Sequence, residues 1–234
     1  GEKIDFTAAT NGDHATAVHF AKAEATLSCA EDGAQTLTFS GWVAVGAYPW
    51  NWTPILSQQK NRQRGFDFGL DYQGRFGLQL AVDDTWVKCL SDATLKMRRW
   101  YHVAATFDAE SGIVLYLDGK PAGRSAVKGR PVFAPDVDLH MGRNHRKMLP
   151  VKRVREWAQF PSWWAHDGML DEVRIYNRAL SGAEIRSAYL REKTDRKPEI
   201  PARRFPDVGG GLKRFGACAT NLTYYEQWDA LWQM

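Results

Sequence analysis

The residues best suited to binding chemistry gather in one segment, residues 143–167, which combines cationic side chains with aromatic rings. From Arg143 to Arg155 the segment holds six cations and no acid. Arginine forks bind carboxylate or sulfate groups in a bidentate way, and flat rings can stack on the apolar faces of sugar rings. An alternative stays open, in which the rings plug one end of the fold and the cations are solvated. The candidate binding residues of this segment are Arg143, His145, Arg155, Trp157, Trp163 and Trp164.

Shorter stretches add further candidates. Trp50 and Trp52 lie together on a proline-containing loop, Arg62 and Arg64 precede an alternating run, and Trp86 follows a turn. A lone tryptophan in a β-sandwich is usually packed, so any of these rings could instead belong to the core. The Trp50 and Trp52 pair is the better surface candidate because its loop carries a proline and two close rings.

Hydrolysis of a glycosidic bond requires two carboxylates that face the sugar together. The nearest match is Asp67 and Asp71, which share one face of a predicted strand with Gly69 between them. Asp171 and Glu172 are neighbours, so on a regular strand they would face opposite sides. The sequence has no HExxH or P-loop pattern. The chain is therefore predicted not to be catalytic; a glycoside hydrolase or lyase with the same fold remains an alternative.

The scaffold that positions these residues is predicted to be all-β. Apolar and polar residues alternate over 36–45, 65–71 and 75–82, and turn residues separate the runs. Asp118-Gly119 lies between two such runs and predicts a type I′ hairpin turn. Many short strands with turns about every ten residues indicate a two-sheet antiparallel sandwich or jelly roll.

One short helix is predicted near the end of this scaffold. Ser181 and Glu184 have the spacing of a capping box, and Leu180 and Ile185 occupy the hydrophobic-staple positions around it. The helix is expected to run to about Leu190.

Three stretches in order resemble the laminin-G-like, concanavalin A-like lectin jelly-roll family. They are Trp100-Tyr-His-Val-Ala-Ala-Thr-Phe-Asp108, Leu115-Tyr-Leu-Asp-Gly-Lys120, and Gly168-Met-Leu-Asp-Glu-Val-Arg-Ile-Tyr-Asn-Arg-Ala-Leu-Ser181. The resemblance covers roughly residues 15–190 and implies consecutive strands of a two-sheet sandwich closed by the last strand and the helix. Segment 143–167 is its least family-like part, because relatives connect the same strands by a shorter loop.

The resemblance implies a function as well as a fold. Such modules include sugar-binding appendages of secreted polysaccharide-processing proteins, so a polysaccharide or oligosaccharide is the expected ligand. The cationic segment favours an acidic glycan. Some members bind protein partners, so a protein–protein adhesion or domain-packing module is the alternative. The expected location is secreted, periplasmic or at the cell surface.

A structural calcium ion is a further implication of the resemblance. Asp171 has the family's strand position, and Asp13 could supply oxygen ligands from an N-terminal loop. The three cysteines show no metal-binding spacing. A pairing of Cys29 with Cys89 stays open beside the alternative that both are small buried residues.

The chain divides into three predicted parts. Residues 1–190 form the jelly-roll domain, and residues 191–204, mostly charged or proline, read as a linker. Residues 205–234 are aromatic again but too few to bury a core alone. They are expected to begin a further, truncated domain or to pack on the sandwich.

Composition excludes several classes of protein. No run of 18 apolar residues occurs, which excludes a helical membrane span. The formal net charge of only +4 disfavours nucleic acid as a partner. Aromatic residues make up 12% of the chain, with ten tryptophans, which suggests a stacking surface in addition to a core.

The segment 143–164 is expected to lie beside the Trp50–Trp52 loop, because the loops of a jelly roll cluster at its edges. Replacing Trp163 and Trp164 by alanine should abolish retention on a glycan affinity gel while changing the melting temperature by only a few degrees. If the double variant unfolds instead, the rings belong to the core.

Overall fold

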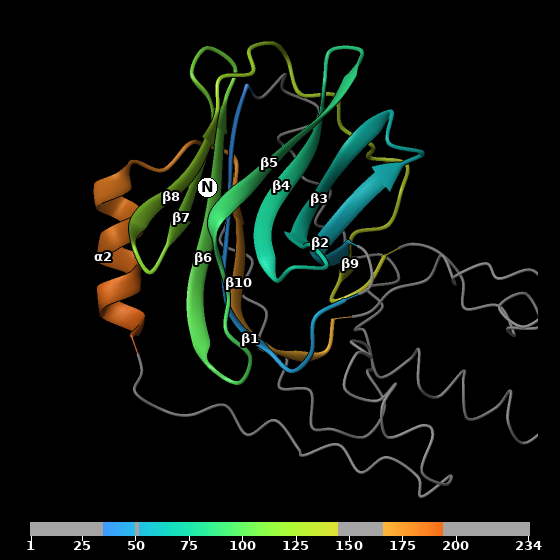
Figure 1. The fold of residues 1–234 in the computed structure, drawn as a ribbon. Coiled ribbons are helices and arrows are strands. Elements are labelled where there is room, and N and C mark those ends of the chain that lie inside the picture. Colours follow the sequence, from blue (N-terminus) through green and yellow to red (C-terminus); the bar gives the residue numbers. More distant parts are fainter. Residues whose placement is uncertain (1–34, 50–51, 145–165, 194–234) are drawn as a thin grey trace, which may run out of the picture.

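The chain folds into two antiparallel five-stranded sheets that pack face to face, as seen in a computed structural model that describes residues 35–49, 52–144 and 166–193 (Figure 1). One sheet has the strand order β10-β1-β6-β7-β8 and the other β5-β4-β3-β2-β9. The strands are β1 (Thr36–Val45), β2 (Thr53–Lys60), β3 (Arg64–Leu70), β4 (Arg75–Val82), β5 (Thr85–Thr94), β6 (Trp100–Asp108), β7 (Gly112–Leu117), β8 (Lys120–Ser125), β9 (His140–Met141) and β10 (Gly168–Tyr176). Helix α2 (Gly182–Glu192) follows the last strand. The predicted jelly-roll sandwich is confirmed.

The alternation in the sequence determines which side of each strand faces the core. In β6, Tyr101, Val103 and Phe107 belong to the core between the sheets, whereas Ala104 packs in a separate apolar cluster on the outer side. Successive side chains on a strand point to opposite faces, so a single apolar alternation forms one buried face per strand. The runs 36–45, 75–82 and 100–108 of the sequence correspond residue for residue to β1, β4 and β6.

Phenylalanine rings join the two sheets at the centre of the sandwich. The ring of Phe39 on β1 lies 4.5 Å from that of Phe66 and 5.8 Å from that of Phe68, both on β3, between ring centroids. All three side chains are fully buried. Aromatic pairs at this separation stabilise a core beyond their buried area. These contacts therefore connect β1 and β3 across the sandwich.

The predicted local signals are also confirmed. Asp118 and Gly119 have φ angles of 49° and 74°, the two left-handed residues that a type I′ turn needs. Ser181 Oγ accepts a hydrogen bond from the Glu184 amide, and the Glu184 carboxylate accepts one from the Ser181 amide. The capping box therefore starts α2 as expected, and the helix ends at Glu192, two residues beyond the predicted end.

Helix α2 covers the outer face of the β10-β1-β6-β7-β8 sheet (Figure 1). Leu180 and Ile185 pack with Tyr116 of β7 in a small buried cluster. The Tyr189 ring stacks on Trp42, with centroids 5.8 Å apart. The helix therefore covers an outer face that combines apolar side chains with buried polar ones such as His102 and Arg174.

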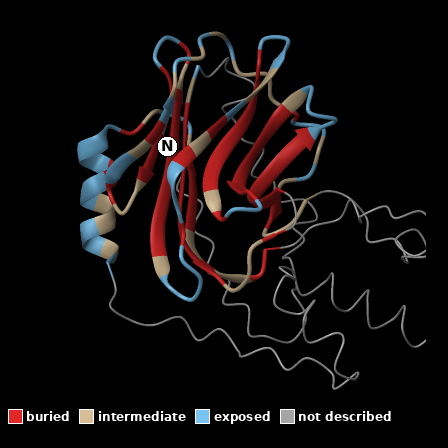
Figure 2. Ribbon diagram, in the orientation of Figure 1, coloured by how far each residue is buried: buried red, intermediate tan, exposed pale blue. Residues whose placement is uncertain are grey.

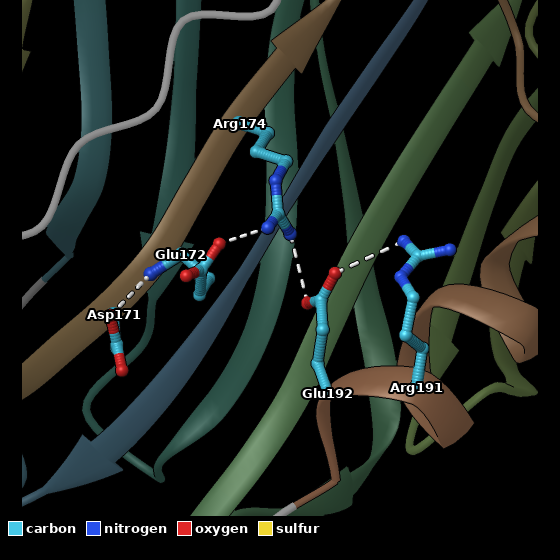
Figure 3. A network of polar contacts seen from close by, with 5 residues as sticks. All are labelled: Asp171, Glu172, Arg174, Arg191 and Glu192. Carbon is cyan, nitrogen blue, oxygen red and sulfur yellow. Dashed lines mark hydrogen bonds and ion pairs between the residues drawn. The ribbon is translucent and has the colours of Figure 1, made fainter.

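An arginine fastens the end of α2 to the last strand (Figure 3). Arg174 Nη1 donates to Glu192 Oε2 at 2.8 Å, and its other terminal nitrogen contacts the Glu172 carboxylate. Burial of Arg174 is compensated by these two carboxylates, which raise its pKa above the usual value. The ion pairs therefore hold the helix end against β10.

The expectation that Asp171 and Glu172 face opposite sides was wrong. Glu172 has a φ of 50°, and the pairing of β1 with β10 shifts between Ser40 and Trp42. Such a bulge inserts one residue into the strand and re-aims its side chain. Glu172 thus reaches Arg174 on the side of the sheet that α2 covers.

Some predictions fall outside the described residues. These are the N-terminal part of the domain with Asp13 and Cys29, most of the linker, and the tail 205–234. Cys89 is described and lies in the core as a small buried residue, where burial raises its thiol pKa to about 11. Whether it pairs with Cys29 stays open.

Replacing Phe39 by alanine should remove the main ring contact between the sheets. Large-to-small changes of a buried phenylalanine cost about 3–5 kcal/mol in the free energy of unfolding. Urea unfolding followed by tryptophan fluorescence would measure this loss. Tyr72→Ala, at a ring that is 61% exposed, is the matched control and should change the free energy by less than about 0.5 kcal/mol. Equal losses in the two variants would contradict the assignment of Phe39 as the centre of the core.

Candidate functional site

A row of polar side chains crosses the outer face of the β5-β4-β3-β2-β9 sheet, the sheet without a helix in the described part of the chain (Figure 1). Asp67 of β3 is the register partner of Ser57 on β2 and of Gln79 on β4. The row continues to β9 and β5, because Ser57 pairs with His140 and Gln79 pairs with Lys88. Register partners share one face, so five strands each contribute one side chain: His140, Ser57, Asp67, Gln79 and Lys88.

The core on the inner side determines where this row points. Phe66 and Phe68 flank Asp67 and lie in the core, so Asp67 must point to the opposite face. Although it faces away from the core, Asp67 is only 5% exposed, and Ser57 is fully buried. Strands β2, β3 and β4 are buried along most of their length (Figure 2). The row is therefore a buried polar layer.

Burial controls the charge of Asp67. Loss of hydration raises its pKa from 3.8 to about 7, against the opposing effects of the Ser57 hydroxyl and the Arg62 charge. Asp67 Oδ1 has no hydrogen-bond partner in the described part of the chain. An unpaired buried carboxylate is costly, so the protonated form is favoured up to neutral pH. The centre of the row can thus donate or accept a hydrogen bond near neutrality.

Trp86 provides a partly exposed ring at the β5 edge of the row. Its indole Nε1 donates to Gln79 Oε1 at 2.8 Å. Trp86 pairs with Ala81, a register position that lies on the same face as Gln79. This hydrogen bond fixes the ring beside the polar layer and leaves the Gln79 amide nitrogen as a donor. Trp86, a predicted binding residue, therefore lies at the candidate site.

Trp52 reaches across the same face but does not form the exposed platform that its loop suggested. The Lys88 ammonium lies 5.5 Å from the centroid of the Trp52 ring, although β3 and β4 separate β2 from β5. Between them, Gly69 and Gly77 are register partners on this face and carry no side chain. The ring is only 7% exposed. The expectation of a surface ring was wrong, because the indole is buried beside the Lys88 side chain.

The ends of segment 143–167 are attached beside the ends of the Trp50–Trp52 loop. The Gly46 amide donates to the Asp167 carbonyl at 2.6 Å, and the Gly142 amide donates to the Ile55 carbonyl at 2.9 Å. The His166 amide closes the base of the segment by donating to the Gly142 carbonyl at 2.6 Å. The two loops therefore start from neighbouring points on the sandwich.

Most candidates of this segment and Trp50 lie outside the described residues: His145, Arg155, Trp157, Trp163 and Trp164. Arg143 is half-buried at the base of the segment, and its Nε is buried. His166, at the other end of the segment, is buried, and burial lowers the pKa of its imidazole to about 4.

The two remaining cations lie at the opposite end of the strands, in the hairpin between β2 and β3. Arg64 and Lys60 both contact Asp136 Oδ2, at 3.0 and 2.8 Å. Arg62 is exposed and occupies a left-handed turn position with a φ of 57°. The structure therefore separates Arg62 and Arg64 from the Trp52 and Arg143 end, although the charge of Arg62 still acts on Asp67.

Asp67 and Asp71 do not form the carboxylate pair of a glycosidase. Asp71 is held by Arg75, whose Nε and Nη2 donate to its Oδ2 at 2.9 and 2.7 Å. Its Oδ1 accepts from the amides of Gln73 and Arg75, which makes Asp71 a turn-forming residue. Four residues along a strand correspond to about 13 Å, beyond the spacing of about 5–10 Å that hydrolysis requires.

Calcium stays a prediction. Asp171 Oδ1 accepts a hydrogen bond from the Glu172 amide at 2.8 Å, which leaves its other carboxylate oxygen for a ligand role. Asp13 lies outside the described residues. Within the described ranges, no cluster of three potential metal-binding side chains is present.

Sequence reasoning missed Ser57, Gln79, Lys88 and His140 as site residues. A signal was present for one of them, because Gln79 lies within Leu-Gln-Leu, as Asp67 lies within Phe-Asp-Phe. A polar residue between two core-facing residues marks the outer face of a strand. Which of these positions meet depends on strand pairing, which the alternation does not specify.

Comparison with known protein families identifies the family to which this fold belongs. A family model described as the concanavalin A-like lectin/glucanases superfamily matches residues 20–186, as the resemblance predicted. No curated protein matches the sequence. Among the described residues, no helix has the length and apolar character that crossing a membrane requires.

Solved structures resemble the chain at low sequence identity. A structure reported for ganglioside-dependent cell entry of botulinum neurotoxin type C is 14% identical, with a TM-score of 0.48 over 68% of this chain and 37% of the toxin chain. A heptameric SAP-like pentraxin from Limulus polyphemus is 17% identical, with a TM-score of 0.48 over 72% of this chain and 76% of its own. A Bacteroides ovatus protein provisionally described as carbohydrate-binding is 17% identical, with a TM-score of 0.48 over 65% of this chain and 40% of its own. The chain thus spans less than half of the toxin and the Bacteroides protein.

The burial of Asp67 predicts a distinctive pH dependence of stability. Because its pKa is raised on folding, the folded chain keeps a proton that the unfolded chain loses, and stability falls as pH rises from about 4 to about 7. Asp67→Asn should remove this contribution. The measurement is the free energy of unfolding in urea across that range, taken as the difference between wild type and variant.

The variant must be compared with the wild type because two buried histidines change the stability in the opposite direction over the same pH range. Burial lowers the pKa values of His102 and His166 to about 4. Both contribute stability that is lost as pH falls from 6.5 towards 4. Asp136→Asn is the control. Lys60 lowers the pKa of the Asp136 carboxyl to about 2, so this group changes the stability only below about pH 4. An Asp67→Asn profile parallel to wild type would contradict the assignment.

Proposed function

Since this chain belongs to the concanavalin A-like lectin/glucanase superfamily, we propose that it is a non-catalytic carbohydrate-binding module of a secreted polysaccharide-processing protein. The observation that carries the proposal is the polar row on the outer sheet face with the Trp86 ring at its edge. Fold membership alone would not separate a sugar ligand from a protein partner.

The chemistry of the face suits a sugar. A sugar ring offers an apolar face to an aromatic side chain and hydroxyl groups to polar side chains. At the β5 edge, Trp86 supplies a partly exposed ring and Lys88 an exposed side chain. The buried Gln79 and Asp67 lie behind them in the polar row. Because the Trp86 ring is fixed by its hydrogen bond, ordering it on binding costs little conformational entropy.

We further propose that the ligand is an acidic glycan. Lys88 places an exposed ammonium at the β5 end of the row, and the base of the cationic segment lies at the Trp52 end. Asp67 would repel an acidic sugar if it were ionised, but its raised pKa keeps it neutral below about pH 7. Binding should therefore weaken above neutral pH, and Asp67→Asn should remove this dependence.

The non-catalytic assignment is supported by the separate roles of the two aspartates. Asp67 is a single buried carboxyl at the centre of the face, whereas Asp71 is bound to Arg75 and to two backbone amides. A downstream domain attached through residues 191–204 would supply the catalytic activity of the parent protein. A structural calcium near Asp171, with Asp13 as a second ligand, remains part of the proposal.

Replacing Trp86 by alanine should abolish retention on affinity gels that contain an acidic polysaccharide. A single stacking contact contributes about 0.5–1.5 kcal/mol, and the change also frees Gln79 from its fixed orientation, so weak binding should fall below detection. Affinity electrophoresis against pectic, algal and sulfated animal polysaccharides would measure the retention. The melting temperature should stay within a few degrees, because the ring is partly exposed.

Tyr72→Ala is the control, since this exposed aromatic ring lies in the β3–β4 turn rather than on the sheet face. It should retain the glycan as the wild type does. No retention by any polysaccharide would favour the protein-partner alternative. Retention that survives Trp86→Ala but is lost in the Trp163 and Trp164 double variant would move the site from the sheet face to the cationic segment.

A further inference from the structure

Three chain segments are fastened together at one end of the sandwich. The Tyr48 hydroxyl donates to the Leu95 carbonyl at 2.8 Å, and the Leu95 amide donates to the Gly74 carbonyl at 2.9 Å. The Arg98 amide donates to the Val45 carbonyl at 2.7 Å. The loop between β5 and β6 is thus anchored at Leu95 and Arg98, and the residues between these two anchors are held outward.

Apolar side chains are exposed at this end. Met97 is 49% exposed between the two anchors, and Tyr72 is 61% exposed in the adjoining β3–β4 turn. In the described part of the chain, three large hydrophobic side chains are this exposed, and the third is Leu190 on α2. These two side chains extend from loops that a backbone hydrogen bond joins, so this end of the sandwich is the candidate for an interaction surface.

Cations flank the exposed methionine. Lys96, Arg98 and Arg99 are all exposed, and the Arg99 guanidinium lies 5.0 Å from the centroid of the Tyr101 ring. The acid of the adjoining turn, Asp71, is buried and bound to Arg75. The Arg99 charge also acts on Asp118, where it opposes the rise in pKa that burial causes. Asp92 lies on β5, three residues before Leu95. The tip formed by Tyr72 and residues 96–99 is therefore cationic and apolar together.

We propose that this tip binds the surface of an anionic lipid bilayer. The cations would contact lipid phosphate and carboxylate groups, and Met97 and Tyr72 would enter the boundary between headgroups and acyl chains. An acidic glycan could also pair with the cations, but it offers no hydrocarbon phase for an exposed methionine. The apolar side chain thus favours the bilayer, and the rigid anchoring means that little loop ordering is needed on binding.

The test is co-sedimentation of the full chain with vesicles made of equal parts phosphatidylserine and phosphatidylcholine, compared with vesicles of phosphatidylcholine alone. Binding should require phosphatidylserine and should weaken as salt is raised. Each cation near an anionic surface contributes roughly a fivefold factor, so Lys96→Gln with Arg99→Gln should weaken binding about 25-fold. Met97→Ser should weaken it severalfold without changing its salt dependence.

Matched controls come from residues of the same type elsewhere. Leu190→Ser removes the third exposed hydrophobic side chain, on α2, and Lys128→Gln removes an exposed cation between β8 and β9. Both should bind vesicles as the wild type does. The proposal is overturned if no vesicle sediments the protein, or if Met97→Ser binds unchanged. Loss of retention on a sulfated polysaccharide gel in the charge variant, without vesicle binding, would assign the tip to an acidic glycan instead.

The proposal does not depend on the sugar site. Trp86→Ala should still bind vesicles, and Met97→Ser should still be retained by the glycan that the wild type binds. Either proposal can therefore fail while the other stands.

Discussion

The contact between Phe39 of β1 and the rings of Phe66 and Phe68 on β3 is the constraint from which the other features follow. The rings join the two sheets by occupying inward positions at the centre of β1 and β3. A strand places alternate residues on opposite faces, and a slip of one residue would expose the whole apolar set. The core therefore fixes the register, and the register decides which residues appear on the two outer faces.

The two outer faces are stabilised by different physical means. On one, α2 buries Trp42 and His102, and Arg174 compensates its own burial with two carboxylates. His102 stays neutral there because burial lowers its imidazole pKa to about 4. On the other, the polar row lies beside the indole rings of Trp52 and Trp86, and burial favours the protonated form of its carboxyl, Asp67, up to about pH 7. The helix-covered face contributes apolar contacts to stability, whereas burying Asp67 Oδ1 without a hydrogen-bond partner costs free energy.

Much of the fold could be predicted because its signals are local. The Asp118-Gly119 turn, the Ser181 capping box and the alternation in Trp100–Asp108 each depend on residues close in the sequence. The features that were mispredicted depend on strand pairing. Glu172 turns because of a bulge opposite β1, and Trp52 is buried beside Lys88, a residue of a strand that does not pair with β2. The alternation of apolar and polar residues within a single strand predicts neither feature.

The candidate site was predictable only in part for the same reason. Trp86 was identified as a ring that could bind, but its partner Gln79 and the centre of the row, Asp67, become neighbours only once β3, β4 and β5 pair. Asp67 is more informative than any aromatic residue here, because an apolar residue or asparagine at the same position would avoid the cost of burying a carboxyl. Natural proteins tolerate such a local cost where a site requires a particular chemical group. The cost of burying Asp67 beside Gln79 and the fixed Trp86 indole is the physical reason for proposing the polar-ligand site at this row rather than elsewhere on the sandwich.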